Sequence, residues 1–251
     1  MNKMKTIQIL AVALTAMVMA ACNNQPEQKT MANQTEVEDK VKPLVQEVLT
    51  QEQRDALTPD DVIKSFKEGN ERFVNNDLTA RDHSAQVRKS AIGQFPKAVV
   101  LSCLDSRVPV EDVFDRGIGD IFVGRVAGNF VNEDLLGSME FGCKVAGSKL
   151  ILVLGHEHCG AVKAAVDDVK LGNITAMLSK IRPAVDKVAY EGDRTSKNEE
   201  FVAKVCESNV VHTIEQIREK SPILKEMEEN GQIKIVGGVY DMDTGIVTFL
   251  D

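Results

Sequence analysis

The stretch Leu150–Gly160, LILVLGHEHCG, begins with five consecutive apolar residues and ends in a segment with two histidines and a cysteine. A short apolar run is typical of a strand that is buried on both faces of a parallel sheet. Two further runs, Ala98–Cys103 and Ile121–Val123, have β-branched residues at their centres. Helical patterns follow these runs, at residues 110–114, 133–145, 160–171, 174–188 and 199–220. Strands that alternate with helices predict an α/β fold with a mostly parallel central β-sheet flanked by helices.

The segments before and after this α/β region also contain patterns that predict helices and strands. Thr58-Pro59-Asp60-Asp61 combines an N-cap threonine, a proline at the first helical position and acids in the first turn, which predicts a helix start. A weaker helical pattern covers residues 41–50, so we expect an N-terminal helical arm. Strand-like segments lie at residues 233–236, 239–240 and 246–249. Turn chemistry at Asp241–Gly245 predicts a C-terminal edge strand or hairpin.

The first 21 residues have the layout of a secretory signal peptide. Lys3 and Lys5 precede an apolar run over residues 7–19, which is shorter than a bilayer span, and small residues follow it. The ending Met19-Ala20-Ala21-Cys22 resembles a bacterial lipobox, which predicts a lipid on Cys22; ordinary cleavage and an uncleaved anchor are the alternatives. We therefore expect an extracytoplasmic (periplasmic-side) protein, anchored to the membrane only by that lipid.

The expected organisation has three parts. Residues 1–21 form the signal peptide, residues 22–50 the lipid-anchor cysteine, a polar tether and the weak helix, and residues 51–251 the α/β domain.

Charge and cysteine content exclude other classes of protein. The formal net charge is -8, and removing the two lysines of the signal peptide would make it -10. Such a chain has no broad basic face for phosphates, so no nucleic-acid partner is expected. Five cysteines without dense spacing do not indicate a disulfide framework. Cys143 and Cys206 lie in helical patterns and are expected to be small buried apolar residues.

Residue types that suit a metal site follow two of the predicted strands. Cys103-Leu104-Asp105-Ser106-Arg107 follows one strand, and His156-Glu157-His158-Cys159-Gly160 follows another. In a parallel sheet, both segments emerge at the carboxyl edge. Two thiolates and one imidazole, from Cys103, Cys159 and His156, would hold one Zn²⁺ per chain and leave a fourth position open. Asp105 could fill that position in a closed, inert state, or Arg107 could capture its carboxylate so that water enters and the site can react.

The other histidines have less specific interpretations. His158 is a competing ligand, but the spacing to Cys159 favours His156, so His158 is expected at the rim of the site or, alternatively, as a proton shuttle. His83 lies in a charged stretch and His212 in a helical pattern, so both are expected to be surface or packing residues.

Cys-x-Asp-x-Arg followed by Gly-His-x-x-Cys-Gly resembles the β-class carbonic anhydrases, and the stretch 120–129, DIFVGRVAGN, is also similar to that family. The resemblance implies zinc bound by Cys103, His156 and Cys159, with Asp105 and Arg107 as a catalytic dyad. It implies reversible hydration of carbon dioxide to bicarbonate and a proton by zinc-bound hydroxide. It also implies an obligate homodimer, or a higher homo-oligomer, in which N-terminal helices embrace the partner and apolar residues of the neighbouring subunit line the pocket.

Two departures from the family pattern affect ligand binding. The chain has no Trp, so the regulatory bicarbonate site of some members is not expected in its usual form. Val108-Pro109-Val110 follows the dyad where plant-type members place a substrate-binding Gln, so a backbone amide near Gly160 is our candidate for the polar substrate contact. Two other functions remain open: hydrolysis of carbonyl sulfide or carbon disulfide, and a non-catalytic zinc or redox sensor with Asp105 on the metal.

Overall fold

The computed structural model describes residues 43–250, so the signal peptide, Cys22 and the tether lie outside the described residues. Within that range the chain forms a five-stranded sheet of order β2-β1-β3-β4-β5. The strands are β1 (Ala98–Ser102), β2 (Ile121–Arg125), β3 (Leu150–His156), β4 (Lys234–Tyr240) and β5 (Val247–Leu250). The first four are parallel and β5 is antiparallel to β4. The predicted α/β fold and the C-terminal hairpin are confirmed.

Helices connect and cover the strands. They are α1 (Gln51–Asp55), α2 (Pro59–Val74), α3 (His83–Ser90), α4 (Val110–Val113), α5 (Glu133–Glu140), the π-helical turn η1 (Phe141–Val145), α6 (Gly160–Val166), α7 (Gly172–Leu178), α8 (Arg182–Lys187), α9 (Glu199–Lys220) and α10 (Pro222–Glu229). α2 begins as predicted, because Thr58 and Asp61 form a capping box with Pro59 at the first helical position. Across residues 43–250, no helix combines the length and apolar character that crossing a membrane requires.

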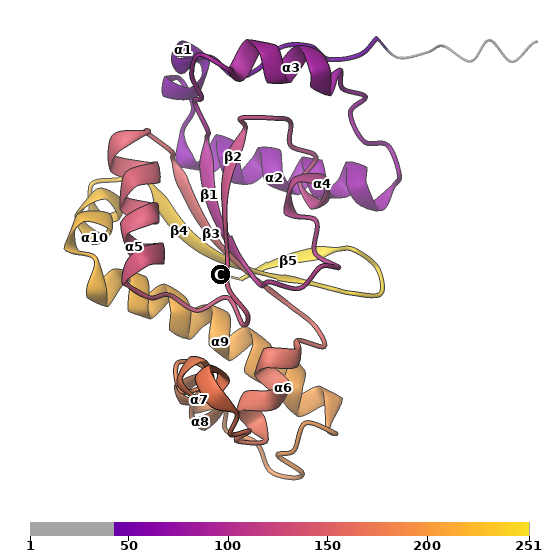
Figure 1. Cartoon of the computed structure of the whole chain (residues 1–251), viewed down its shortest axis with the longest axis vertical. Coiled ribbons are helices and arrows are strands. Elements are labelled where there is room, and N and C mark those ends of the chain that lie inside the picture. The colour runs from indigo at the N-terminus through magenta and orange to yellow at the C-terminus, as the bar shows by residue number, and fades with distance from the viewer. Residues whose placement is uncertain (1–42, 251) are drawn as a thin grey trace, which may run out of the picture. The chain divides into compact units, whose positions relative to one another are not determined.

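The sheet has an apolar layer on each face. Successive strand residues point to opposite faces. Accordingly, Val99 and Ile151 pack in a cluster with α5, α9 and α10, whereas Val100 and Leu152 pack with α2 and α4. Figure 1 shows α5 and α10 to the left of the strands and α2 and α4 to their right. Because both faces are covered, the central strands β1 and β3 are buried along their whole length.

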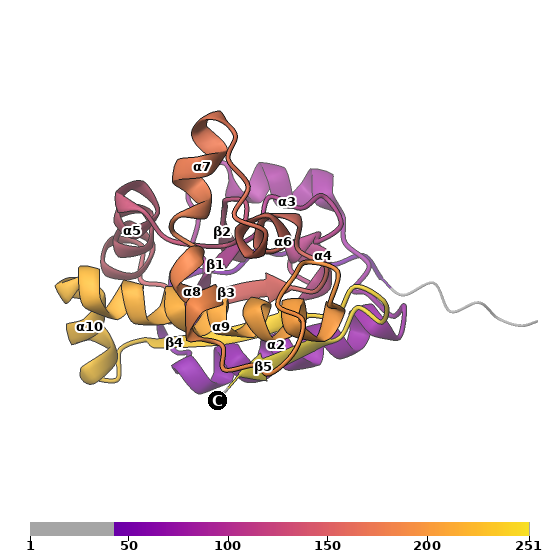
Figure 2. The ribbon, with the colours of Figure 1, turned by 90° about the horizontal axis from the view of Figure 1, so that it is seen from below.

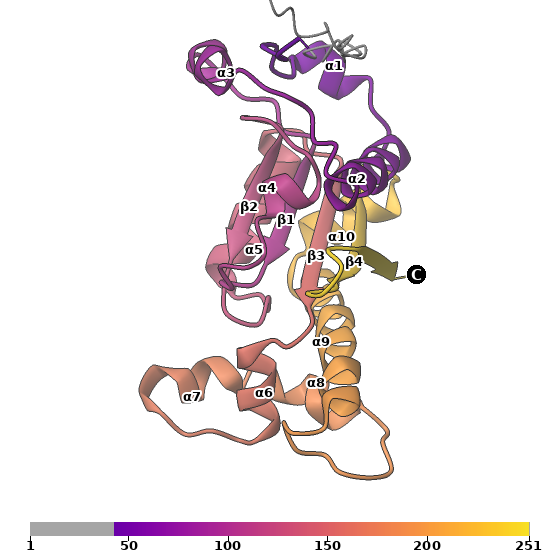
Figure 3. The ribbon, with the colours of Figure 1, turned by 90° about the vertical axis from the view of Figure 1, so that its right-hand side faces the viewer.

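Strand register places the residues that matter for function at one edge. Ser102, the last residue of β1, pairs with Leu154 of β3, and β3 continues for two residues to His156. Cys103 therefore leaves the sheet beside the end of β3. A third apolar cluster at this carboxyl edge contains Cys103, Cys159 and side chains of α6, α7, α8 and α9. Figures 2 and 3 show α7 projecting away from α9 in this region.

One predicted helix, over residues 41–50, is wrong. The described part of that segment, from residue 43, contains no helix, and the first helix is α1, with Thr50 as its N-cap. Val45 pairs with the 80–82 segment, because its N–H donates to the carbonyl of Ala80 and its carbonyl accepts from Asp82 N–H. These backbone bonds replace the helical ones, so tertiary pairing outweighs a weak local preference.

Three predicted helices are shorter or divided. The 133–145 helix changes to the π-helical turn η1 after Glu140, and the 160–171 helix ends at Val166. The 174–188 helix is split into α7 and α8 just before Pro183, which has no N–H to continue the α-helical ladder. The short helices α3 and α10 were not predicted, because eight-residue segments carry little periodicity.

Candidate metal centre

The side chains of Cys103, His156 and Cys159 converge at the carboxyl edge of the sheet. Cys103 follows β1, His156 ends β3, and Cys159 is the N-cap of α6. One potential ligand atom from each lies within 4.8 Å of the other two, and all three residues are buried. The structure thus brings together the three ligands that the sequence suggested, although the two cysteines lie 56 positions apart in the sequence.

Hydrogen bonding decides which nitrogen of His156 faces this point. Nδ1 lies 2.8 Å from the carbonyl oxygen of Glu157. A carbonyl only accepts, so Nδ1 carries the hydrogen and Nε2 has the free lone pair. Nε2 is buried and has no hydrogen-bond partner among residues 43–250. A buried imidazole fixed in this way is oriented as histidine ligands of metals are.

The two cysteines differ in their electrostatic environment. Their sulfurs lie 3.9 Å apart, and Cys103 Sγ also accepts a hydrogen bond from Gly128 N–H at 3.3 Å. The hydrogen bond with Cys159, together with backbone hydrogen bonds, lowers the pKa of Cys103 to about 4. The hydrogen bond with Cys103, together with burial, raises the pKa of Cys159. Of the two sulfurs, that of Cys103 is therefore the one that more readily forms a thiolate.

Asp105 and Arg107 form a two-pronged ion pair beside the ligands. Arg107 Nε and Nη2 donate to Oδ1 and Oδ2 of Asp105 at 3.0 and 2.8 Å, and the Arg107 backbone N–H donates to Oδ1 at 3.0 Å. These bonds lower the pKa of Asp105 to about 2. Asp105 Oδ2 is 3.9 Å from His156 Nε2. A fixed carboxylate therefore faces the ligand cluster and remains paired with the guanidinium.

Arg125 and Gly128 support the site without belonging to the ligand set. Arg125, the last residue of β2, donates to the carbonyls of Cys103 and Val108 at 3.0 and 2.8 Å, so it braces both ends of the loop that carries Cys103 and the dyad. Gly128 provides the backbone donor to Cys103. We assigned neither residue a role from sequence, although both lie in the family-like stretch 120–129.

The remaining predicted residues are placed as follows. Gly160 is exposed at the first position of α6, and no atom lies near the position that its Cβ would occupy. His158 is half-buried with φ 52° and lies close to Glu157 and Asp243, in a group of side chains separate from the three ligands. His83 is exposed and His212 is partly buried against Lys187 and Glu215.

The other two described cysteines are buried, as predicted. Burial raises the pKa of Cys143 and of Cys206 to about 12, so both thiols stay protonated at neutral pH. Cys206 belongs to the same apolar cluster as Cys103 and Cys159, but it is not part of their group of converging ligand atoms.

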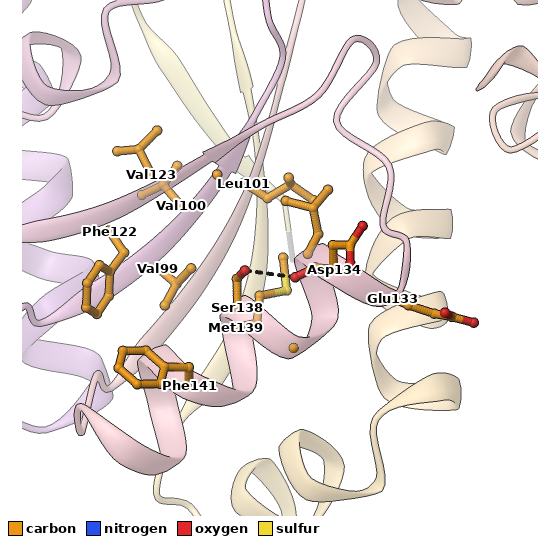
Figure 4. A pocket seen from close by; sticks show the side chains of 13 residues that line it. Val99, Val100, Leu101, Phe122, Val123, Glu133, Asp134, Ser138, Met139 and Phe141 are labelled. Atoms are coloured by element: carbon orange, nitrogen blue, oxygen red, sulfur yellow. Dashed lines mark hydrogen bonds between the residues drawn. The ribbon is translucent and has the colours of Figure 1, made fainter. Parts of the chain in front are cut away.

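A separate apolar groove of about 670 Å³ lies between the edge strand β2 and α5. Figure 4 shows Phe122 of β2, Val99 of β1 and Phe141 of η1 around it. Neither the three predicted metal ligands nor the two dyad residues line it. Phe141 is 55% exposed and Val145 70% exposed, so apolar surface continues along η1.

Comparison with known proteins gives consistent matches. A family model described as carbonic anhydrase matches residues 98–247. Carbonic anhydrase 2 of Mycobacterium tuberculosis is 37% identical over 197 residues, which cover 75% of this chain and 91% of that relative. The Coccomyxa β-carbonic anhydrase in complex with acetazolamide has a TM-score of 0.59 at 28% identity, covering 75% of this chain and 84% of that one. A tetrameric β-carbonic anhydrase of Sordaria macrospora has a TM-score of 0.57 at 23% identity, covering 65% and 84%.

Proposed function

The chain belongs to the β class of the carbonic anhydrase family, enzymes that hydrate carbon dioxide, and from that premise we propose that Cys103, His156 and Cys159 hold its catalytic zinc. The observation that carries this proposal is the convergence of three buried ligand atoms beside the paired Asp105 carboxylate.

The residues present fit zinc by their chemistry. Thiolate and imidazole are the donors that zinc prefers, and three protein ligands are typical of a catalytic zinc site. The Nε2 atom of His156 is buried without a hydrogen-bond partner in the described chain, and a metal ligand needs such a free lone pair. The lowered pKa of Cys103 favours its thiolate, the form in which a cysteine binds a metal.

When bound, zinc would lower the pKa of a water molecule, so that a nucleophile is present near neutral pH. Asp105 would accept a hydrogen bond from that nucleophile and turn its lone pair toward carbon dioxide. Arg107 holds both carboxylate oxygens, so Asp105 is kept from binding the metal. If Arg107 released it, Asp105 could become the fourth ligand and close the site.

The substrate contact that we propose is the backbone amide of Gly160. This residue directly follows the ligand Cys159 and is exposed at the start of α6. Because Gly160 has open space where a Cβ would be, a small molecule can approach its main chain closely.

Stopped-flow carbon dioxide hydration, with metal content measured on the same purified protein, tests this proposal. We expect one zinc per chain and activity that rises between pH 6.5 and 9. Asp105→Asn should keep the zinc and lose about 10²–10⁴-fold in kcat, the range for a positioned acid–base group. Asp112→Asn is the matched control, because Asp112 is an exposed carboxylate outside the site.

Two outcomes would contradict the proposal. Full activity in Asp105→Asn with zinc bound would remove the dyad from the mechanism. Full zinc without carbon dioxide hydration at any pH would favour the alternative functions, and adding carbonyl sulfide would then separate a hydrolase from a sensor.

We also propose that the enzyme works as a homodimer or higher homo-oligomer. The outer edge of β2 has no strand partner among the described residues, and the groove beside it is apolar. Such an edge is a natural surface for a second copy. The Sordaria macrospora relative is tetrameric. Light scattering of the purified protein should give at least twice the 27.5 kDa chain mass, less the signal peptide.

Finally, we propose that the mature enzyme is an extracytoplasmic lipoprotein anchored through Cys22. The support is the signal-peptide layout and the lipobox-like ending. Metabolic labelling with an alkyne fatty acid should mark the wild-type protein and leave Cys22→Ser unmarked. Equal labelling of both would refute the anchor.

A further inference from the structure

We propose that Asn209, in the middle of α9, is a positioning residue for the metal ligand Cys103. It holds the loop whose backbone N–H donates to the Cys103 sulfur. The inference rests on the proposed zinc site and adds to it a residue about 50 positions beyond the last ligand. Asn209 does not touch the ligand itself, so its effect is exerted through the main chain at Gly128.

The contact of Asn209 is unambiguous in its direction. One amide atom lies 2.7 Å from the carbonyl oxygen of Gly128. A carbonyl can only accept, so that atom must be Nδ2. The residue is 1% exposed, and its Oδ1 has no partner within residues 43–250. A buried amide whose oxygen has no hydrogen-bond partner is unfavourable. If this position served packing alone, an apolar side chain would be more stable there. The donor bond to Gly128 is therefore the reason for an amide at this position.

Gly128 connects this bond to the metal centre. Its N–H donates to Cys103 Sγ at 3.3 Å, while its carbonyl accepts from Asn209. The residue has φ +82°, and a Cβ here would lie 2.3 Å from Ile181 Cδ1. The main chain therefore passes between α8 and the sulfur at a place where only glycine fits. An N–H that points at sulfur favours the thiolate and fixes the direction of its lone pairs.

The close approach of α9 to the sheet places Asn209 within reach. The neighbouring Val210 packs where Gly155 of β3 and Gly237 of β4 have no side chain. Cβ atoms at these glycines would lie 2.6 and 2.7 Å from the Val210 methyl groups. With α9 fixed at this depth, the Asn209 amide meets the loop at the carboxyl edge of the sheet.

Zinc affinity and a cobalt spectrum test the inference. We would measure the zinc dissociation constant by competition with a chelator for wild type, Asn209→Leu and Asn209→Ala. The cobalt-substituted proteins would give the thiolate-to-cobalt charge-transfer band. We expect zinc affinity to fall about 10- to 100-fold, the usual effect of removing an outer hydrogen bond at a metal site. We also expect the band to shift, which a general loss of stability would not cause.

Thr213→Val is the matched control. Thr213 lies one turn further along α9, is 1% exposed, and its hydroxyl has no partner among the described residues. Removing that hydroxyl changes buried polarity on the same helix and leaves the hydrogen bond between Asn209 and Gly128 in place. We expect the zinc affinity and the cobalt band of Thr213→Val to match those of wild type.

The outcomes distinguish the inference from the proposed zinc site. If the wild type binds no zinc, or Cys103→Ser binds it unchanged, the zinc site is wrong and the inference falls with it. If the wild type binds zinc through Cys103 but both Asn209 variants stay within twofold with the same band, only the inference is overturned. An equal loss in Thr213→Val would also overturn it. If Asn209→Leu does not fold, Asn209→Ala decides.

Discussion

Replacing Asp115 with Asn is expected to weaken the packing of α2 and of the segment 79–81 against the loop that follows α4. The Asp115 side chain is completely buried. Its carboxylate accepts hydrogen bonds from Arg72 Nε and Arg81 Nη1, both at 2.5 Å, and from the backbone and hydroxyl of Thr79 at 3.1 and 2.6 Å. An amide in that place would present N–H groups to the guanidinium groups and leave them without a counter-charge.

The pKa of Asp115 gives the size of the effect. Burial alone would raise this pKa, but the hydrogen bonds from Thr79, Arg72 and Arg81 outweigh it and lower the pKa from 3.8 to about 2. At about 1.4 kcal/mol per pH unit, this difference corresponds to about 2–3 kcal/mol of stability at pH 7. For a domain of this size we therefore expect Tm to fall by about 5–10 °C.

Urea unfolding of wild type and Asp115→Asn at several pH values measures this contribution. The folded-state pKa lies below the unfolded one, so the stabilisation is complete above about pH 4 and is lost as the pH falls from about 4 to about 2. The gap between the two proteins should therefore be about half as large at pH 3 as at pH 7. Asp112→Asn, an exposed control in the same segment, should stay within about 0.5 kcal/mol of wild type. A gap below about 0.5 kcal/mol at pH 7, or one that does not shrink by pH 3, would refute the reasoning.

Three further changes have defined outcomes. Chelation of the metal should abolish carbon dioxide hydration and allow alkylation of Cys103 and Cys159, which mass spectrometry detects. Zinc that is added before alkylation should restore the activity. Activity without detectable metal would contradict the zinc site. Thr58→Ala removes the capping box of α2 and should cost about 1 kcal/mol, seen as a Tm about 2–4 °C lower by calorimetry. Gly155→Ala places a Cβ 2.6 Å from Val210 and should destabilise the fold by about 1–3 kcal/mol in urea. Val210→Ala in the same chain should recover part of that loss, and no recovery would rule out the clash.

The sheet could be predicted from the sequence because its central strands are buried on both faces. Leu150–Leu154 and Ala98–Ser102 appear as apolar runs, and the helices between them imply parallel order. The helix over residues 41–50 was predicted wrongly for the opposite reason. Its local pattern was weak, and the structure of that segment depends on backbone pairing between Val45 and residues 80–82. Such a partner distant in sequence leaves no local signal.

In the candidate site, too, some residues can be predicted from local sequence and others cannot. The metal ligands and the dyad are rare residue types at short spacings, so the local sequence is enough to identify them. Arg125 and Asn209 act through backbone carbonyls, and any arginine or asparagine can do that. Only the folded chain shows that Arg125 ends the strand beside Cys103 and that α9 lies deep enough for Asn209 to reach Gly128. Residues that support a site are therefore harder to predict than those that form it.

Strand register explains which spacings in the site are fixed. β1 and β3 are adjacent and parallel, so Cys103 lies beside the end of β3 whatever connects the two strands. The cysteines lie 56 positions apart, with β2, α5 and η1 between them, and this separation does not determine where the sulfurs meet. By contrast, His156 ends a strand and Cys159 caps the following helix, so the two residues between them must turn the chain. His158 completes that turn with φ 52°. The spacing within each short motif is therefore set by local backbone geometry. The pairing of β1 with β3 in the sheet brings the two motifs together.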